Sequence, residues 1–207
     1  MYVIDFDGTI VDLWPRYCSV FKAILNLKSL SIDDYKIIKQ KLKRDSLVAE
    51  YFGKQLPNDY FSRKASMLED RDFLLLDSPL IDISLLNNLL LNNAIILTKR
   101  RNEKSFQWQL VKLGIYERYV VIDSGKKIDW VRKNLQEQKI TVIGDSTAEL
   151  EIAQLPNVDA WMVGYGLSDK ADFDLRMIPY NFFNTPVELE YKLRRQMDAI
   201  QRFTEAI

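Results

Sequence analysis

The chain has 207 residues, of which 47% are apolar and 12% aromatic, enough for one sizeable hydrophobic core and a second, smaller lobe. Lysine plus arginine equals aspartate plus glutamate at 29 each, so no overall field would draw the protein to nucleic acid or to an anionic membrane. We therefore expect neither a nucleic-acid partner nor a membrane partner.

The sequence contains no histidine and one cysteine, Cys18. The lack of histidine excludes Ser-His-Asp and Cys-His catalytic pairs and removes the commonest zinc ligand. A single cysteine cannot form an internal disulfide. The chain opens with no charged and apolar leader, and no apolar run reaches the roughly 20 residues that span a bilayer. These features predict a cytoplasmic protein whose chemistry depends on carboxylates, lysine and a hard metal ion.

Two carboxylates follow the apolar segment that opens the chain. Residues 1–4 predict a strand, and Asp5 and Asp7 come directly after it. Side chains alternate along a strand, so these two acids share one face, and Gly8 allows the backbone to turn sharply. Ligands bind at the carboxyl edge of an open parallel sheet, where paired acids suit a divalent cation and a phosphate. An ordinary turn at the end of a strand is the alternative.

Three later apolar segments also end in polar side chains. Residues 94–97 are followed by Thr98, residues 119–122 by a loop with Lys126 and Lys127, and residues 140–143 by Gly144, Asp145, Ser146 and Glu149. The segments alternate with amphipathic runs, which is typical of a parallel sheet with crossover helices. We therefore predict an α/β fold with a Rossmann-like parallel sheet core, in which these polar groups meet at one edge.

The remaining core elements follow from spacing and stop signals. After Thr98, apolar residues recur at helical spacing until Gly114, which is a typical helix stop. Residues 160–164 predict a fifth strand and residues 177–183 a short edge segment. A terminal helix is predicted from residue 185, where a Thr-Pro pair opens it, to about residue 202.

Residues 13–83 show no strand alternation and predict a helical insert between the first two strands of the sheet. The expected helices cover residues 15–27, 31–52, 57–69 and 70–76. Such an insert is too long for an unstructured connection in a compact domain, so we expect it to fold as its own lobe. Residues 1–12 and 84–207 would then form the core. The alternative is that these helices simply cover the sheet.

The ordered set of strand-end groups resembles the haloacid dehalogenase-like (HAD) superfamily. Its four motifs are Asp-x-Asp-x-Thr, a Thr or Ser after a strand, a Lys before a helix, and an acidic Gly-Asp loop. The insert has the position of the cap that many phosphatases of this superfamily carry, as in its phosphoglycolate phosphatase-like branch. The resemblance implies a phosphatase that depends on Mg²⁺ and hydrolyses a small phosphorylated metabolite.

This resemblance also implies a role for each motif residue. Asp5 would be the nucleophile that forms an aspartyl-phosphate, and Asp7 would act first as an acid and then as a base. Asp5, the backbone carbonyl of Asp7, and Asp145 would bind Mg²⁺. Thr98 would donate a hydrogen bond to the phosphoryl group, and a lysine would pair with Asp5. Substrate contacts are expected from Gly8, Thr9 and Lys99.

Some assignments stay open at this point. Lys127 is favoured over Lys126 as the motif lysine, because apolar residues follow Lys127 in the phase found in related phosphatases. Glu149 stands where the superfamily usually has a further Asp, and would either support the metal ligands or lie on a helix surface. Ser146 would share that loop, and Asp12 would stabilise the hinge to the insert.

Two other functions also stay open. A phosphomutase of the same fold would need groups in the insert that hold a sugar phosphate while it turns, and the lack of histidine counts against it. A non-catalytic binding or scaffold protein would be expected to lose one of the motif aspartates, all of which are present. Residues 99–101 form a basic run that could hold an anionic substrate or simply be exposed. The sequence sets neither the substrate nor the oligomeric state.

Overall fold

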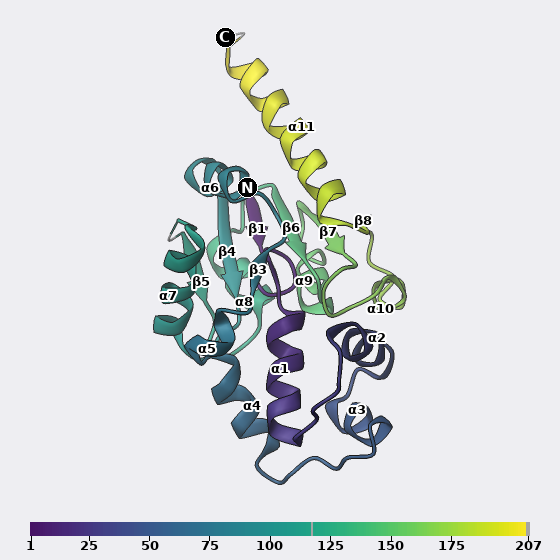
Figure 1. The fold of residues 1–207 in the computed structure, drawn as a ribbon. Helices are drawn as coiled ribbons and strands as arrows, with labels where there is room; N and C mark the ends of the chain where they lie inside the picture. Colours follow the sequence, from purple (N-terminus) through teal and green to yellow (C-terminus); the bar gives the residue numbers. More distant parts are fainter. Residues whose placement is uncertain (117, 206–207) are drawn as a thin grey trace.

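The fold is built on one parallel sheet. The computed structural model describes residues 1–116 and 118–205, and side chains up to residue 199. Within these residues, six strands form the sheet in the order β5-β4-β1-β6-β7-β8, and each neighbouring pair is parallel. The strands are β1 (Tyr2–Ile4), β4 (Ala94–Thr98), β5 (Tyr119–Val121), β6 (Ile140–Gly144), β7 (Val158–Val163) and β8 (Asn181–Phe183). This arrangement confirms the predicted α/β, Rossmann-like core (Figure 1).

Strand β1 lies inside the sheet and connects its two hydrophobic cores. Tyr2 and Ile4 belong to one buried apolar cluster and Val3 to another, as expected when side chains alternate along a strand. Ile4 pairs with Ile96 of β4 and with Ile143 of β6. The residues that follow β1, β4 and β6 therefore emerge next to one another at the carboxyl edge of the sheet.

Helices cover both faces of this sheet. Helices α6, α7 and α11 contribute to the cluster of Tyr2 and Ile4, whereas α8, α9 and α10 contribute to the cluster of Val3. Their bounds are α6 (Ile83–Asn92), α7 (Glu103–Leu113), α8 (Lys127–Asn134), α9 (Thr147–Ile152), α10 (Lys170–Asp174) and α11 (Pro186–Glu205). The terminal helix α11 begins where the Thr-Pro pair predicts and extends beyond the sheet (Figure 1).

The ends of the core elements follow local rules. In α7 the Asn102 side chain accepts a hydrogen bond from the Ser105 backbone at 3.2 Å, and Gly114 ends the helix with φ 70°. The predicted fifth strand is β7, two residues earlier than its expected start at residue 160. Of the edge segment predicted over residues 177–183, only β8 forms a strand.

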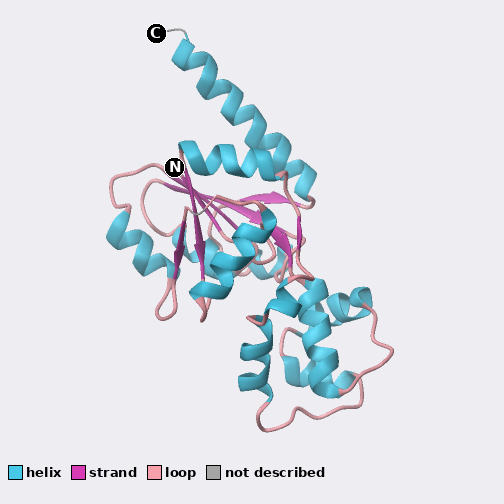
Figure 2. Ribbon diagram, turned by 60° about the vertical axis from the view of Figure 1, so that its left-hand side comes forward, coloured by secondary structure: helices cyan, strands magenta, loops and turns pink. Residues whose placement is uncertain are grey.

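The insert forms a helical lobe with its own hydrophobic core. Its helices are α1 (Trp14–Leu25), α2 (Ile32–Leu42), α3 (Asp45–Tyr51), α4 (Tyr60–Leu68) and α5 (Arg71–Leu74). Trp14, Phe21, Tyr35 and Tyr60 are among the side chains of a buried cluster that is separate from those of the sheet. Figure 2 shows the lobe as a body beside the sheet rather than a layer on it. No helix in residues 1–116 and 118–205 is both long and apolar enough to cross a membrane.

The chain enters and leaves the lobe through two short antiparallel strands. In this link, β2 (Val11–Asp12) pairs with β3 (Ser78–Pro79). Asp12 lies in the link, and its carboxylate accepts a hydrogen bond from the Trp14 backbone at 3.0 Å. The sequence predicted no strand between residues 13 and 83, and β3 corrects this. At two residues, β3 is too short to show an alternating pattern.

The single helix predicted over residues 31–52 is two helices, α2 and α3. The start is as expected, because the Ser31 side chain caps α2 by accepting from the Asp34 backbone at 3.0 Å. The break falls at Lys43, whose φ of 61° is incompatible with a continuous right-handed helix. Its ammonium contacts Asp172 of the core, so the residue that ends α2 also joins the lobe to the sheet domain.

Candidate active site

Side chains from three neighbouring strand ends line one cavity of about 360 Å³ at the carboxyl edge of the sheet. Asp5 follows β1, Thr98 ends β4, and Asp145 follows β6. The Asp5 backbone donates to the carbonyl of Ile143 at 2.8 Å, which continues the parallel ladder one residue beyond β1. Lys127 lines the same cavity from the start of α8. The structure thus brings together residues that are far apart in the sequence.

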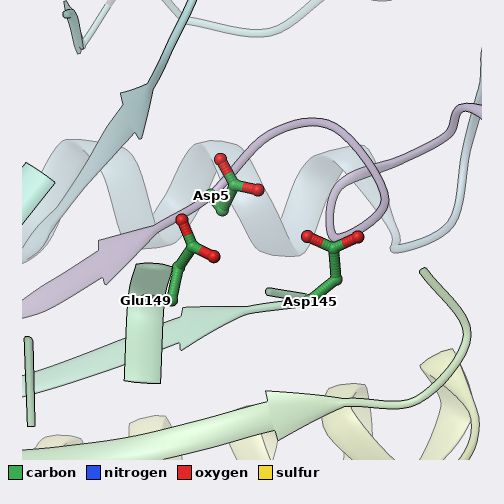
Figure 3. Close-up of side chains that lie close together, drawn as sticks. All are labelled: Asp5, Asp145 and Glu149. Carbon is green, nitrogen blue, oxygen red and sulfur yellow. The ribbon is translucent and has the colours of Figure 1, made fainter. Parts of the chain in front are cut away.

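Asp5, Asp145 and Glu149 form a compact group that we call the acidic cluster. Each offers one carboxylate oxygen, and these oxygens lie within 4.8 Å of one another (Figure 3). Burial raises the pKa of Asp5 to about 7, against the opposing effect of Lys127 and with a further increase from Glu149. Burial, Asp5 and Glu149 raise the pKa of Asp145 as well. Crowded buried carboxylates of this kind fit a hard divalent cation such as Mg²⁺, which prefers oxygen ligands.

Glu149 is directed into the acidic cluster by the start of α9. Ser146 caps this helix, and Glu149 accepts a hydrogen bond from the Ser146 backbone at 3.2 Å in a capping box. A Cβ at position 144 would collide with the Glu149 side chain, so Gly144 leaves the space that Glu149 fills. With 2% of its surface exposed, Glu149 does not lie on a helix surface, which was one of the two expected placements.

The two candidate lysines have different surroundings. The Lys127 ammonium contacts the carboxylate of Asp5 and lies 2.6 Å from that of Glu149. Burial alone would lower the pKa of Lys127, but Asp5 and Glu149 outweigh it, so the pKa is raised and the side chain stays charged. Lys126 is exposed and lies 3.6 Å from Glu151. Of the two, the structure brings Lys127 to the acidic cluster.

Two glycines form a close-fitting cradle for Asp145. A Cβ on Gly8, which has φ 78°, or on Gly166 would collide with the Asp145 carboxylate. The Leu167 backbone donates to this carboxylate at 2.7 Å. Gly8 thus has a packing role, and neither Gly8 nor Thr9 lines the cavity. The Thr9 side chain is fully buried, and its contact with a substrate stays a prediction.

Thr98 and Lys99 lie next to each other at the end of β4 but in different environments. Thr98 is 1% exposed and lines the cavity close to the acidic cluster. Lys99 is exposed, lines the same cavity, and donates to the carbonyl of Gly125 at 3.2 Å. Both residues therefore border the space that a substrate would occupy.

Asp7 lies outside the acidic cluster and is paired with two arginines. The Arg100 guanidinium lies 2.8 Å from each of its carboxylate oxygens, and Arg16 of the helical lobe contacts one of them. Burial would raise the pKa of Asp7, but Arg100 and Arg16 outweigh that effect and lower it. The carboxylate of Asp7 is therefore held in its charged form.

These contacts continue into a closed ring of side chains, which we call the arginine ring. Arg16 lies 3.1 Å from Asp77, Gln109 donates to Asp77 at 2.7 Å, and Arg100 donates to Gln109 at 3.0 Å. Asp7 closes the ring between the two arginines. The ring joins α1 of the lobe, the segment before β3, α7 of the core, and the loop after β4.

The sequence analysis missed Arg16, Asp77 and Gln109. One alternative in the sequence analysis was that Arg100 belongs to an exposed basic run. The structure has this residue only 4% exposed. One signal was present: Gln109 lies three residues after Phe106, on the side of the helix that the apolar spacing predicts to be buried. A polar side chain at such a position needs a buried partner.

No protein-family model and no curated protein sequence matches this chain. Solved structures match it over most of its length. A HAD family hydrolase from Deinococcus radiodurans, with bound phosphate and sodium, has a TM-score of 0.65 at 13% identity and covers 94% of each chain. A predicted phosphoglycolate phosphatase from Haemophilus somnus has a TM-score of 0.61 at 16% identity, over 93% of this chain and 97% of that one.

A third structure carries a different name. Protein Tyrosine Kinase A from Mycobacterium tuberculosis has a TM-score of 0.64 at 19% identity, over 93% of this chain and 96% of that one. At such low identities the likeness concerns the fold, and a fold hosts more than one activity. The chain therefore shares its fold with HAD family hydrolases, and its reaction has to be argued from the side chains of the cavity.

Proposed function

We propose that this protein is a phosphatase that depends on Mg²⁺ and hydrolyses a small phosphorylated metabolite through an aspartyl-phosphate. The observation that carries the proposal is the meeting of Asp5, Thr98, Lys127 and Asp145 in one cavity. Hydrolysis of a phosphate monoester needs a nucleophile, positive charge against the phosphoryl oxygens and in-line positioning. Asp5 can supply the nucleophile and Lys127 the positive charge, and the shape of the cavity would position the substrate.

Asp5 is the proposed nucleophile. Its carboxylate oxygen would form a bond to phosphorus while the bond from phosphorus to the ester oxygen breaks, and water would later open the aspartyl-phosphate. The contact between Lys127 and Asp5 supports this role, because the ammonium opposes the effect of burial on the Asp5 pKa and would lie next to the phosphoryl group of a bound substrate. The Thr98 hydroxyl would donate to a phosphoryl oxygen.

Asp7 is the proposed acid and base. As an ionised carboxylate it can accept a proton from the water that attacks the aspartyl-phosphate. To protonate the leaving oxygen, it must first gain a proton, which its two arginines oppose. Arg16 belongs to the helical lobe, so movement of the lobe away from the core would remove one of the two guanidinium groups that lower the pKa of Asp7. We therefore propose that the lobe is a cap whose position changes the charges around Asp7.

The acidic cluster is the proposed Mg²⁺ site. Asp5, Asp145 and the Asp7 backbone carbonyl would hold the ion, with Glu149 as a further ligand or as a partner of a bound water. The packed glycine cradle of Asp145 and the raised pKa of two of the carboxylates support this assignment. When bound, the ion would neutralise charge on the transferring phosphoryl group.

Hydrolysis of p-nitrophenyl phosphate with and without Mg²⁺ tests this proposal. We expect phosphate release that depends on Mg²⁺ and is lost in Asp5→Asn. Lack of metal-dependent turnover above that variant would favour a non-catalytic binding protein. Interconversion of sugar phosphate isomers without phosphate release would favour a phosphomutase. A panel of cellular phosphate esters would then identify the substrate.

A further inference from the structure

A second cavity of about 350 Å³ adjoins the active-site cavity. Asp7, Tyr17 and Lys99 line both, so these three side chains lie where the two cavities meet. The second cavity lies between the helical lobe and the core. Its other walls come from α1, α3, α4, the residue after α4, and the loop after β4. The part of a substrate that leaves when phosphorus is attacked would extend into this space.

The second cavity is lined by more cations than carboxylates. The cations are Arg16, Lys64, Lys99, Arg100 and Arg101, and the carboxylates are Asp7, Asp45 and Glu69. Arg16 and Arg100 belong to the arginine ring and are paired with Asp7. Lys64, Lys99 and Arg101 therefore decide the charge that a ligand would meet.

These three cations are incompletely neutralised. Among the described residues, the Arg101 guanidinium contacts no carboxylate; only its backbone is involved, donating to Glu69 at 3.4 Å. The Lys99 ammonium donates to a backbone carbonyl. Lys64 lies 2.6 Å from Asp45, but Lys39 occupies the other oxygen of that carboxylate at 2.7 Å, so two ammonium groups share one negative charge.

We propose that the leaving group of the substrate carries an anionic group of its own, a carboxylate or a second phosphate, which binds Lys64 and Arg101 in the second cavity. This inference rests on the proposed phosphatase function. A neutral alcohol would leave the surplus positive charge of this cavity unmatched, and Lys64 is only 16% exposed, so water compensates it poorly. An anion would complete the pairing of both side chains through charge-assisted hydrogen bonds. Lys99, at the junction of the two cavities, would face the ester oxygen side of the substrate.

Binding to the Asp5→Asn variant in the presence of Mg²⁺ tests the inference without turnover. The probes are propyl phosphate, the phosphate ester of 3-hydroxypropanoate, and 1,3-propanediol bisphosphate, which differ only in the far end of a three-carbon leaving group. We expect isothermal titration to show that at least one of the two anionic esters binds at least about tenfold more tightly than propyl phosphate does, as measured by the ratio of the dissociation constants. Their order identifies a carboxylate or a phosphate as the preferred group. Equal affinity for all three would overturn the inference.

Variants that replace a cation with a neutral side chain show which residues cause the preference for anionic esters. Arg101→Gln and Lys64→Gln, each combined with Asp5→Asn, should each lower the ratio of anionic to neutral affinity by about threefold or more. Arg132→Gln removes the same charge from an exposed site outside both cavities and should keep the ratio. If Lys64→Gln fails to fold, Arg101→Gln still tests the assignment, because Arg101 is exposed. An unchanged ratio in Arg101→Gln would contradict the assignment.

Hydrolysis of the same three esters by the unmodified protein separates this inference from the proposed function. Equal kcat/KM for all three would leave the phosphatase in place and remove the anion site. Tighter binding of an anionic ester, with no release of phosphate from any probe, would support the anion site and contradict the proposed phosphatase function.

Discussion

The acidic cluster and the arginine ring both reach the active-site cavity, but they balance their charges differently. The cluster has three carboxylates and one cation, Lys127. The ring has two carboxylates, Asp7 and Asp77, and two guanidinium groups. Where buried charges of both signs are equal in number, as in the ring, the side chains neutralise one another. A buried group with excess negative charge, as in the cluster, needs a further cation. This difference supports the proposal that the cluster is a metal site, whereas the ring joins the lobe to Asp7.

The substitution Asp5→Asn should have the largest effect, because it removes the proposed nucleophile. We expect kcat for p-nitrophenyl phosphate to fall by about 10⁴-fold or more. The metal-free protein should at the same time be no less stable, because one of three crowded carboxylates is gone. Phosphate release and thermal unfolding measure the two effects. Activity within about tenfold of the unmodified protein would contradict the assignment of Asp5.

Lys127→Gln should have the second largest effect, because it leaves the acidic cluster without its cation. We expect activity to fall by about 10³-fold and the free energy of unfolding by about 3 kcal/mol. The matched control is Lys126→Gln, the same change at the neighbouring exposed residue, which should alter stability by less than about 0.5 kcal/mol. Urea unfolding and steady-state kinetics compare the two variants. Equal losses in both would show that the position of the charge does not matter.

Glu149→Gln tests the cluster as a metal site. Glutamine can keep the capping box of α9 but supplies no negative charge, so we expect Mg²⁺ affinity to fall by about 10- to 100-fold with little loss of stability. Glu151→Gln, on the same helix, is the control. Calorimetric titration of the metal measures both. Unchanged affinity in Glu149→Gln would remove this residue from the metal site.

Asp77→Asn should have the smallest effect on activity, and its expected effect is on the pH dependence of stability. Burial raises the pKa of Asp77 from 3.8 to about 7, so the folded protein binds more protons than the unfolded chain between these pH values. This carboxyl therefore makes the free energy of unfolding decrease as pH rises through that range. The difference in the free energy of unfolding between Asp77→Asn and the unmodified protein should grow with pH, by at most about 1.4 kcal/mol per pH unit. Urea unfolding at several pH values in excess Mg²⁺ measures it, and a constant difference would refute the expectation.

The acidic cluster could be predicted because its signals are local. Asp5 and Asp145 each follow an apolar strand, and parallel strands end at the same edge. The sequence also contains the Ser-x-x-Glu pattern that directs Glu149 inward, although the pattern alone does not say whether the helix start is buried. The choice of Lys127 over Lys126 rested on helix phase, and the structure has Lys127 against the cluster.

The arginine ring could not be predicted because its members are distant in sequence and carry no shared pattern. Arg16 and Asp77 lie at opposite ends of the helical insert, and they meet only because the link of β2 and β3 brings those ends together. The break at Lys43 was missed for a similar reason. A positive φ at a residue other than glycine, as at Lys43, carries no local sequence pattern that predicts it.

The chain enters and leaves the helical lobe through the paired strands β2 and β3, so we expect that the lobe could be removed as a unit. Because Asp12 and Ser78 are partners in an antiparallel pair, a tight turn between them could replace the whole lobe without altering the path of the sheet. The truncated protein would keep every residue of the acidic cluster while losing Arg16 and Lys64. Grafting a foreign lobe onto the same two strands would, by the same geometry, exchange the surface proposed to face the leaving group and leave the residues of the acidic cluster unchanged.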